Sequence, residues 1–549
     1  MQLSHVRGNI ETKGEFEMNM KDLLMNRGKD IPMRKSNKAA DILFWLLFAL
    51  LIAASVYLFI RCTPYGVGLV SDSVNYINGA RSIAAGDGYY RQSGGGELKP
   101  ITNFPPLYSI CLSVPFLFGM KWQYAVWWVA LFFFTLNTAV IIRLIWLASG
   151  FRWAGLLGAV MLLAMRPYLY YQFYAMSEPV YYFCTLLAFI LMIQGFRHGK
   201  FLWWLGCGLA CGAAFLARYI GIVSLCAIFG MILIFVKNKR PQAFGGHFCG
   251  ALPLIGWWLI RNALITGNAS NRQILAHWVT MDDLRHGILI LWRWIYPTRY
   301  GNLEDPVGWM VWGTAAFFAL SAIFCIVLMI LNAHRKKPFS TAVIFIWTAL
   351  LFIIGYNLFV ILTISLFDAS VNIEERILFP AFMVFFLIPP VIFGWLCNRR
   401  DYLPALLPLV LILFFTVNFV QDTIPHLSTM AEHGYGWGWE GWDTSPSMQL
   451  IRTLPEDKII YSNQIEAVSL WTGRGAYALL DPVDPSSEQV REGYQDTLNE
   501  IRRQVNDGQA VLVFFGITSW VGSGDNWITQ LCDGLPFLYR DTSEWVVGK

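Results

Sequence analysis

The chain has 549 residues, of which 56% are hydrophobic and 14% are charged, and its formal net charge is +5. Soluble proteins carry roughly a quarter charged residues, so this composition excludes an ordinary soluble enzyme. Much of the positive charge lies in short loops between apolar runs, which favours a role in membrane orientation over nucleic-acid binding. We therefore predict a polytopic α-helical membrane protein with a small C-terminal α/β domain outside the cytoplasm.

Apolar runs predict about eleven membrane-spanning helices. Residues 1–40 are polar and basic without an early apolar core, which predicts a cytoplasmic segment and excludes a cleavable signal peptide. The predicted transmembrane domain covers residues 41–420, and the α/β domain covers 421–549. The predicted spans lie near residues 41–60, 123–147, 153–169, 178–196, 201–217, 219–236, 245–263, 307–331, 341–366, 377–396 and 402–420.

Basic clusters fall in alternate loops, on the same side as the basic N-terminal segment. Because positively charged loops stay in the cytoplasm, we predict a cytoplasmic N-terminus and a C-terminal domain on the periplasmic or extracellular side of a cell (inner) membrane. The opposite loops, 61–122, 166–178, 262–306 and 367–376, collect aromatic, acidic and arginine residues, so we expect a site on the outer face. The basic clusters are FRHGK (196–200), KNKR (237–240), AHRKKP (333–338) and CNRRD (397–401).

The C-terminal region has the pattern of a small α/β domain. KIIYS (458–462) and QAVLVFF (509–515) are short apolar runs typical of buried strands. Residues 486–508 between them have the charge and periodicity of an amphipathic helix that ends at Gly508. EWVVG predicts a last strand at the end of the chain.

The first outer loop, 61–122, holds the leading catalytic candidate. Its sequence GLVSDSVNYINGARSIAAGDGYY places Asp72 a few residues beyond the first span. Ionisable groups near membrane depth are costly and usually functional, and a carboxylate there can act as a general base. The alternative is helix capping, because Ser71 and Asp72 precede a plausible helix.

Glu178 is the second catalytic candidate. In FYAMSEPVYYF it opens an apolar helix, with Pro179 in the first turn. Capping and compensation of the helix dipole are the alternative roles. We favour an active-site role because Glu178 and Asp72 are predicted on the same outer face.

Arginines on the outer face predict an anionic ligand, because guanidinium groups bind phosphate oxygens well. Arg376, Arg218 and Arg261 are the strongest candidates for phosphate binding. Each can instead pair with Asp368, Glu374, Glu375 or a backbone carbonyl. In the first loop, Arg81, Lys99 and Tyr108 (the tyrosine of TNFPPLYS) are also predicted to contact substrate. The outer-face basic residues are Arg81, Arg91, Lys99, Arg166, Arg218, Arg261, Arg272, Arg293, Arg299 and Arg376.

The sequence assigns no metal site and no certain cofactor, and it leaves a divalent metal open. The ten cysteines show no CxxC or zinc-type spacing, so packing is their predicted role. Cys62 and Cys111 flank the first loop, and a disulfide between them is an alternative. No phosphate loop, Rossmann fingerprint or DxD motif is present, which argues against a nucleotide-sugar donor. Scattered histidines predicted to be interfacial or solvated are His277, His286 and His433.

These motifs resemble those of the GT-C glycosyltransferase superfamily, in its protein O-mannosyltransferase and aminoarabinose transferase branch. The resemblance covers roughly residues 41–400. It implies inverting transfer of a sugar from a polyprenyl-phosphate donor on the non-cytoplasmic face, with Asp72 as the catalytic acid residue of the first loop. Ser73 follows Asp72, whereas the branch usually has an adjacent Asp-Glu pair. The motifs are SDSVNYINGARSIAAGDGYY with TNFPPLYS, AMSEPVYYF, FLARYIGIVSL, LPLIGWWLIRN followed by TGN, and EERILFPAF.

The sequence therefore predicts a membrane glycosyltransferase with Asp72 as general base. Its partners are the bilayer, a polyprenyl-phosphate sugar, and a glycan, lipid or protein acceptor. A transporter or flippase of a lipid-linked sugar is the alternative, but no internal repeat typical of transporters is visible. A membrane-anchored sensor leaves the elaborate first loop unexplained. Trp437, Trp439 and Trp442 predict an aromatic belt at the membrane surface, or a surface that stacks on sugar rings.

Overall fold

The computed structural model describes residues 38–549 apart from a set of short segments and one long one. The predicted span near 307–331 lies outside the described residues, as do Arg272, Arg299, His277 and Asp368. Two compact units, residues 1–50 and 51–549, divide the chain, and every contact reported below lies within the second. The segments not described are 93–96, 237–238, 270–278, 296–338 apart from isolated positions, 367–372, 440, 480–481, 485–488 and 518–526.

The described residues confirm a polytopic helical membrane protein. In the described part of the chain, seven helices are long and apolar enough to cross a bilayer, or eight if the pair α6–α7, bent by 81°, counts as one span. The total of about eleven stays a prediction, because α9 and the segment Tyr219–Phe235 are apolar but shorter. The seven long helices are α2 (Lys38–Cys62), α5 (Trp122–Ser149), α8 (Glu178–His198), α11 (Arg240–Thr266), α14 (Thr341–Leu366), α15 with α16 (Glu375–Phe386 and Ile388–Asn398) and α17 (Tyr402–His433).

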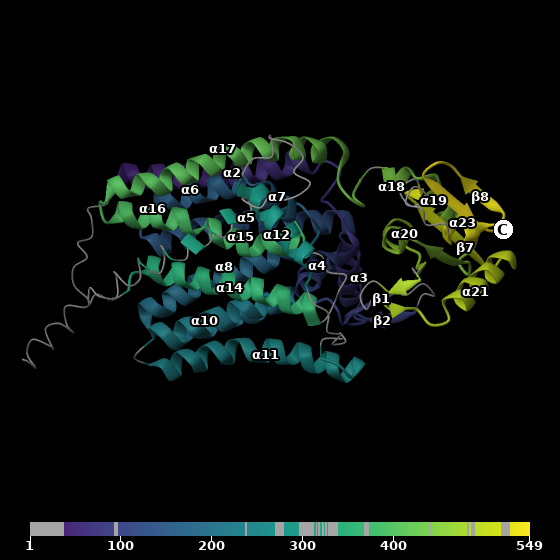
Figure 1. Ribbon diagram of the computed structural model, residues 1–549, viewed down its shortest axis with the longest axis horizontal. Helices are drawn as coiled ribbons and strands as arrows, with labels where there is room; N and C mark the ends of the chain where they lie inside the picture. The colour runs from purple at the N-terminus through teal and green to yellow at the C-terminus, as the bar shows by residue number, and fades with distance from the viewer. Residues whose placement is uncertain are drawn as a thin grey trace, which may run out of the picture. The chain divides into compact units, whose positions relative to one another are not determined.

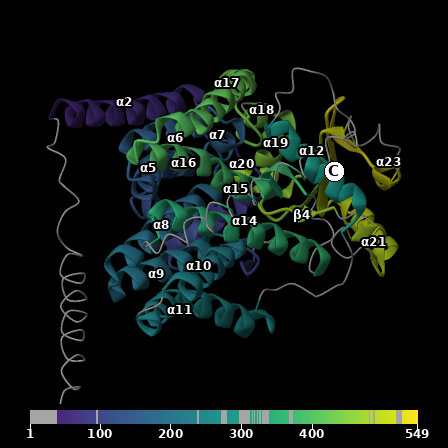
Figure 2. The same cartoon turned by 60° about the vertical axis from the view of Figure 1, so that its left-hand side comes forward.

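In residues 51–549, helices pack against their neighbours in the sequence and against helices far away in the sequence. Helix α5 contacts α6, α8 and α16, while α9 contacts α8 and α11 (Figures 1 and 2). Helix α17 continues past its predicted end at residue 420 to His433. Shorter helices between α5 and α14 are α6 (Arg152–Leu163), α7 (Arg166–Gln172), α9 (Phe201–Ala217), η2 (Tyr219–Gly221), α10 (Ile222–Phe235) and α12 (Met281–Ile295).

The first outer loop folds into two helices and a small hairpin. Helix α3 (Ser71–Ala85) starts after an extended Val70 and ends at Gly86, whose φ of 86° suits glycine at a helix C-terminus. Strands β1 (Tyr90–Gln92) and β2 (Leu98–Pro100) pair antiparallel, and α4 (Leu107–Leu117) packs against α3. Cys62 and Cys111 are both free thiols, so the structure does not contain the alternative disulfide.

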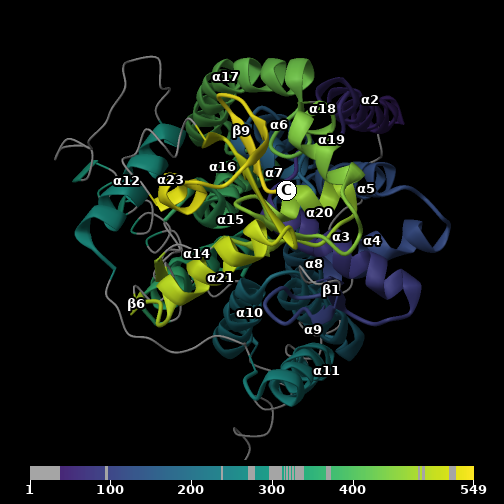
Figure 3. The same cartoon turned by 90° about the vertical axis from the view of Figure 1, so that its right-hand side faces the viewer.

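A five-stranded sheet in the order β4-β3-β7-β9-β8 forms the C-terminal α/β region. Figure 3 shows this region facing the viewer, with β9 labelled. The three predicted strands are present, and β3 pairs parallel with β7 while β9 pairs antiparallel with β7. Alternate residues of β7 pack against α21 and α23 on one face and α19 and α20 on the other, which explains its continuous apolar run. The strands are β3 (Ile459–Ser462), β4 (Tyr477–Ala478), β7 (Ala510–Phe515), β8 (Phe537–Arg540) and β9 (Glu544–Val547).

The predicted helix over 486–508 begins later than expected. Helix α21 covers only Tyr494–Asn506, because Gln489–Val490 form strand β6 and pair with β5 (Val483–Asp484). Gly493, with φ of 66°, makes the turn between the strand and the helix. The other helices of this region are α18 (Gly441–Thr444), α19 (Pro446–Thr453), α20 (Ile465–Thr472) and α23 (Trp527–Cys532).

Candidate active site

Four predicted site residues that are far apart in the sequence meet in one ion-pair cluster. The Nη2 atom of Arg376 lies 2.6 Å from Oδ2 of Asp72. The Nε atom of Arg376 donates to Oε1 of Glu178, and Arg218 pairs with the same oxygen. The charges of the two carboxylates and two guanidinium groups balance, and this pairing offsets the desolvation cost of burying them.

A bridge between the first loop and the α7–α8 turn brings Asp72 close to Glu178. The backbone N–H of Gly68 donates to Phe173, at 2.9 Å, and the N–H of Ala175 donates to Gly68, also at 2.9 Å. A Cβ on Gly68 would lie 2.6 Å from the ring of Tyr174, so only glycine allows this approach. A few residues further on, Tyr76 of α3 donates its hydroxyl hydrogen to Ser177, which precedes Glu178.

Asp72 occupies the second position of α3, and its carboxylate pairs with Arg376. The capping interaction at this helix start is made instead by Ser73, whose hydroxyl accepts from the backbone N–H of Val70 at 3.0 Å. Helix dipoles also favour an acid in the first turn. Ser73 therefore makes the capping hydrogen bond of α3, and the Asp72 carboxylate is free to take part in the ion-pair cluster.

Asp72 and Glu178 differ in access. The Asp72 side chain is 23% exposed, and that of Glu178 is 1% exposed. Glu178 is the first residue of α8, behind Arg218 and Arg376. A ligand can therefore reach Asp72, whereas Glu178 contacts a ligand only through the arginines that it holds.

A cavity of about 380 Å³ opens onto this cluster. Asp72, Arg218 and Arg376 line it, together with the polar side chains of Tyr76, Asn103 and Tyr356. Phe104, Phe359, Val360 and Ile364 supply apolar wall. A polar cluster next to an apolar wall suits an amphiphilic ligand with a charged head.

Tyr76 and Tyr356 are cavity residues that the sequence analysis missed. Tyr76 follows Asp72 by one helical turn, so the predicted helix contained the signal. Burial raises the pKa of Tyr76 well above its ordinary value, and Asp72 raises it further, so its hydroxyl stays a neutral donor. Tyr356 lies within the apolar helix α14, where nothing in the sequence pattern distinguishes it from a packing residue.

The other predicted substrate-binding residues lie away from the cluster. Arg261 donates to the backbone carbonyls of Ile101 and Tyr89, so it holds the first loop in place. Tyr108 is buried against Tyr76, with ring centroids 5.2 Å apart. Lys99 on β2 lines a second cavity of about 220 Å³, and Arg81 lies in α3 without lining either cavity.

Acids near Arg376 have different partners. Glu375 pairs with Arg166 at 2.5 Å and accepts from Trp294 at 2.6 Å, while Asp422 also pairs with Arg166, at 3.0 Å. Glu374 lines the main cavity. The alternative of a structural partner thus describes Arg166, which pairs with acids, and Arg261, which bonds backbone carbonyls. Arg376 pairs with Asp72 and Glu178 instead of the adjacent Glu375.

The second cavity lies on another face of α3. Asn75 and Asn78 of α3 line it with Arg91, Lys99 and the Glu466 of α20. Arg91 donates to the side-chain oxygen of Asn75 at 2.7 Å. Burial raises the pKa of Glu466 above its ordinary value. Helix α3 thus lies between the cavity with the ion-pair cluster and a second cavity lined by Arg91, Lys99 and Glu466.

Among the described residues, one group of side chains has the spacing of metal ligands, and it lies outside both cavities. It consists of Cys207 and Cys211 of α9 and His247 of α11. Of the histidines considered from sequence, His286 lies in α12 and His433 is exposed at the end of α17. Neither contributes to a group of potential metal ligands in the described part of the chain.

No protein-family model and no characterised protein sequence matches the chain, but solved structures do. ArnT from Cupriavidus metallidurans bound to undecaprenyl phosphate aligns with a TM-score of 0.53 at 14% identity, over 92% of this chain and 97% of that one. Its apo state gives 0.48 at 15%, over the same shares. AglB from Archaeoglobus fulgidus, in complex with an inhibitory peptide and a dolichol-phosphate, gives 0.47 at 11%, over 91% and 74%.

The ArnT alignment extends over nearly all of both chains. At this low identity the alignment concerns the fold alone, which this chain shares with the ArnT structure. The resemblance predicted from the first-loop and later motifs is thereby confirmed at the level of the fold.

Proposed function

We propose that the chain is an integral-membrane glycosyltransferase that takes a sugar from a polyprenyl-phosphate donor. The observation that carries this proposal is the cavity in which Asp72, Arg218 and Arg376 meet beside an apolar wall. The ArnT structure, bound to undecaprenyl phosphate, supplies a ligand of the class that such a cavity suits. The sugar is transferred on the outer face of the membrane, where the first loop is predicted to lie.

The arginines bind the donor phosphate. A guanidinium group has five N–H donors, and the ion pairs engage Nε and Nη2 of Arg376 and Nη1 of Arg218. The remaining donors are available to phosphate oxygens in the cavity. Glu178 fixes both guanidinium groups from behind, so they need little reorganisation when the donor binds.

Asp72 activates the acceptor. Its ion pair with Arg376 engages Oδ2, which leaves Oδ1 to take the proton of an acceptor hydroxyl or amine. The deprotonated acceptor attacks the anomeric carbon from the side opposite the phosphate, so the configuration inverts. The bond between the anomeric carbon and the phosphate oxygen breaks, and Arg218 and Arg376 stabilise the charge of the leaving polyprenyl phosphate.

Asp72→Asn tests this mechanism. The amide keeps the shape of the side chain but cannot take a proton, and general-base catalysis contributes about 10²–10⁴-fold. We therefore expect a folded protein that binds a polyprenyl-phosphate sugar and has lost at least about a hundredfold in turnover. The assay is consumption of radiolabelled polyprenyl-phosphate sugars by purified protein, with thermal unfolding measured alongside. Near-normal turnover in the folded variant would show that Asp72 is not the base.

A further inference from the structure

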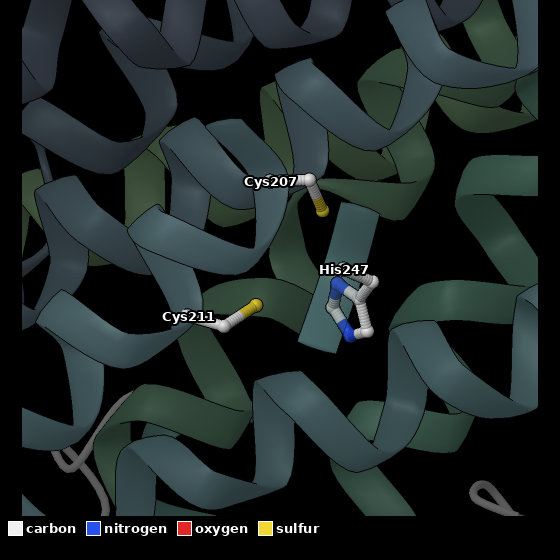
Figure 4. A group of neighbouring side chains, drawn as sticks. All are labelled: Cys207, Cys211 and His247. Atoms are coloured by element: carbon white, nitrogen blue, oxygen red, sulfur yellow. The ribbon is translucent and has the colours of Figure 1, made fainter. Parts of the chain in front are cut away.

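A thiol and imidazole cluster lies between helices α9 and α11, and the proposed transfer reaction does not use it. Cys207 and Cys211 are one turn apart on α9, so they share a helix face. His247 comes from α11, and the potential ligand atoms of the three residues lie within 4.8 Å of one another. Figure 4 shows both sulfur atoms and the imidazole ring pointing toward one another. All three side chains are wholly buried.

Close helix packing holds this cluster together. A Cβ on Gly208 of α9 would lie 2.0 Å from the carbonyl oxygen of His247, and a Cβ on Gly250 of α11 would lie 2.3 Å from that of Leu205. Neither backbone atom can yield easily, so glycine is needed on both helices. Small residues let membrane helices approach to backbone contact. The separation of the cysteines from His247 is therefore set by the two helix backbones.

The imidazole is oriented as a ligand. Its Nε2 lies 3.2 Å from the carbonyl oxygen of Leu225, and because a carbonyl only accepts, Nε2 carries the proton. The lone pair is thereby on Nδ1, which is buried and has no hydrogen-bond partner among the described residues. Histidines that bind metals usually donate their other ring N–H to a carbonyl or carboxylate in this way. A metal ion bound by the neighbouring sulfurs would engage this lone pair.

The ligand set selects the metal. Two thiolates and a neutral imidazole suit zinc or copper(I). With Zn²⁺ the complex is neutral, whereas Cu⁺ leaves a net negative charge, which is costly among apolar helices. Zinc–sulfur bonds of about 2.3 Å place two sulfurs about 3.8 Å apart in a tetrahedral site. Side chains already within 4.8 Å of one another reach that arrangement by small rotations.

We propose that Cys207, Cys211 and His247 bind one Zn²⁺ ion that ties α9 to α11. Three protein ligands leave one coordination position for water. The ion fixes the helix at whose C-terminus Arg218 stands, so its first effect is on the stability of this helix pair. The proposal does not depend on the transfer reaction.

Metal analysis of the purified full-length chain tests the site. Protein from cells grown with added zinc, isolated in detergent through a histidine-free tag, should contain one zinc ion per chain by mass spectrometry. The Cys207→Ala/Cys211→Ala variant and His247→Ala should fall to background zinc and unfold at a lower temperature. Cys62→Ala is the matched control, because Cys62 is a buried cysteine outside the cluster, and it should retain the zinc.

A second measurement needs no substitution. Wild-type protein from cells grown with Co²⁺ in place of Zn²⁺ should show the thiolate-to-cobalt absorption in the near ultraviolet. A cobalt-loaded protein without that absorption overturns thiolate ligation. Wild-type protein without zinc, or equal zinc in the wild type and both ligand variants, overturns the site itself. Copper in place of zinc overturns the assignment of a divalent ion.

Discussion

Arg376 contacts the carboxylates of Asp72 and Glu178 with one guanidinium group. Its role therefore depends on the planar shape of the side chain as well as on its charge. Replacing Arg376 with Ala should weaken donor binding by roughly 1.5–3 kcal/mol, the range for a charge-assisted hydrogen bond to phosphate. Lys should recover only part of the loss, because it lacks the planar fork. Binding of a radiolabelled polyprenyl-phosphate sugar to the purified variants measures both effects.

The control for Arg376 is thermal unfolding, because Ala also leaves Glu178 with one arginine fewer. Arg91→Ala is a matched variant, since Arg91 lines the second cavity and bonds Asn75 outside the ion-pair cluster. Donor affinity that is unchanged in a folded Arg376→Ala protein assigns Arg376 to a structural pair with its acids.

Glu178 should behave as a positioning residue and differ from Asp72 in its response to amide substitution. Glu178→Gln removes the only negative charge that pairs with Arg218 among the described residues, and it leaves two guanidinium groups close together. Breaking a buried ion pair costs about 3–5 kcal/mol, so we expect a lower unfolding temperature and weaker donor binding together. Asp72→Asn should lose turnover with little loss of either. A Glu178→Gln protein of normal stability and donor affinity but no turnover would make Glu178 the base.

At the scale of elements, the break between α9 and α10 positions Arg218. The short helix η2 follows Arg218 directly, and its last residue is Gly221. A Cβ at Gly221 would lie 2.3 Å from the carbonyl carbon of Ala214, a backbone atom of α9. Glycine is therefore required for α9 and α10 to turn this tightly around Arg218.

Gly221→Ala should force this turn open. Overpacking of this kind costs about 1–3 kcal/mol, so the variant should unfold at a lower temperature and bind donor more weakly through a displaced Arg218. Gly206→Ala in α9 is the control, because the nearest neighbour of its Cβ would be a Leu191 methyl at 3.6 Å, an ordinary contact. Equal unfolding temperatures and donor affinities for the two variants would contradict this role for Gly221.

At the scale of the whole molecule, the side of the membrane on which the cavity opens decides which substrates it meets. The alternation of basic loops predicts that the first loop and the C-terminal region lie outside. Cysteines introduced at exposed positions test this with an impermeant thiol reagent in intact cells or spheroplasts. Gln495 of α21 and Lys200, between α8 and α9, are exposed positions predicted on opposite sides.

Gln495→Cys should label and Lys200→Cys should not until the membrane is permeabilised. Wild-type protein gives the background from its own cysteines. Labelling of Lys200→Cys alone in intact cells reverses the topology and removes the argument for an enzyme acting on the outer face.

The sequence alone determined the class of fold, because the bilayer imposes its requirement on each helix separately. A span needs about 20 apolar residues, and that signal is local, so the long helices and the strands β3, β7 and β9 were predicted close to their positions. Helix α21 was predicted too long because Gln489–Val490, at the start of the predicted helix, pair instead with Val483–Asp484 in the short hairpin β5–β6. Asp72 was visible as a costly acid near the membrane.

Only the tertiary structure decided which charges meet. Asp72, Glu178, Arg218 and Arg376 lie on four separate segments, and no pattern along the chain predicts that their side chains meet. A distance between side chains depends on how whole helices pack, and packing at Gly68 or Gly208 depends on atoms far along the chain. The same reason hid the Cys207, Cys211 and His247 cluster, because its third member stands on another helix and zinc-type spacing along the chain is absent.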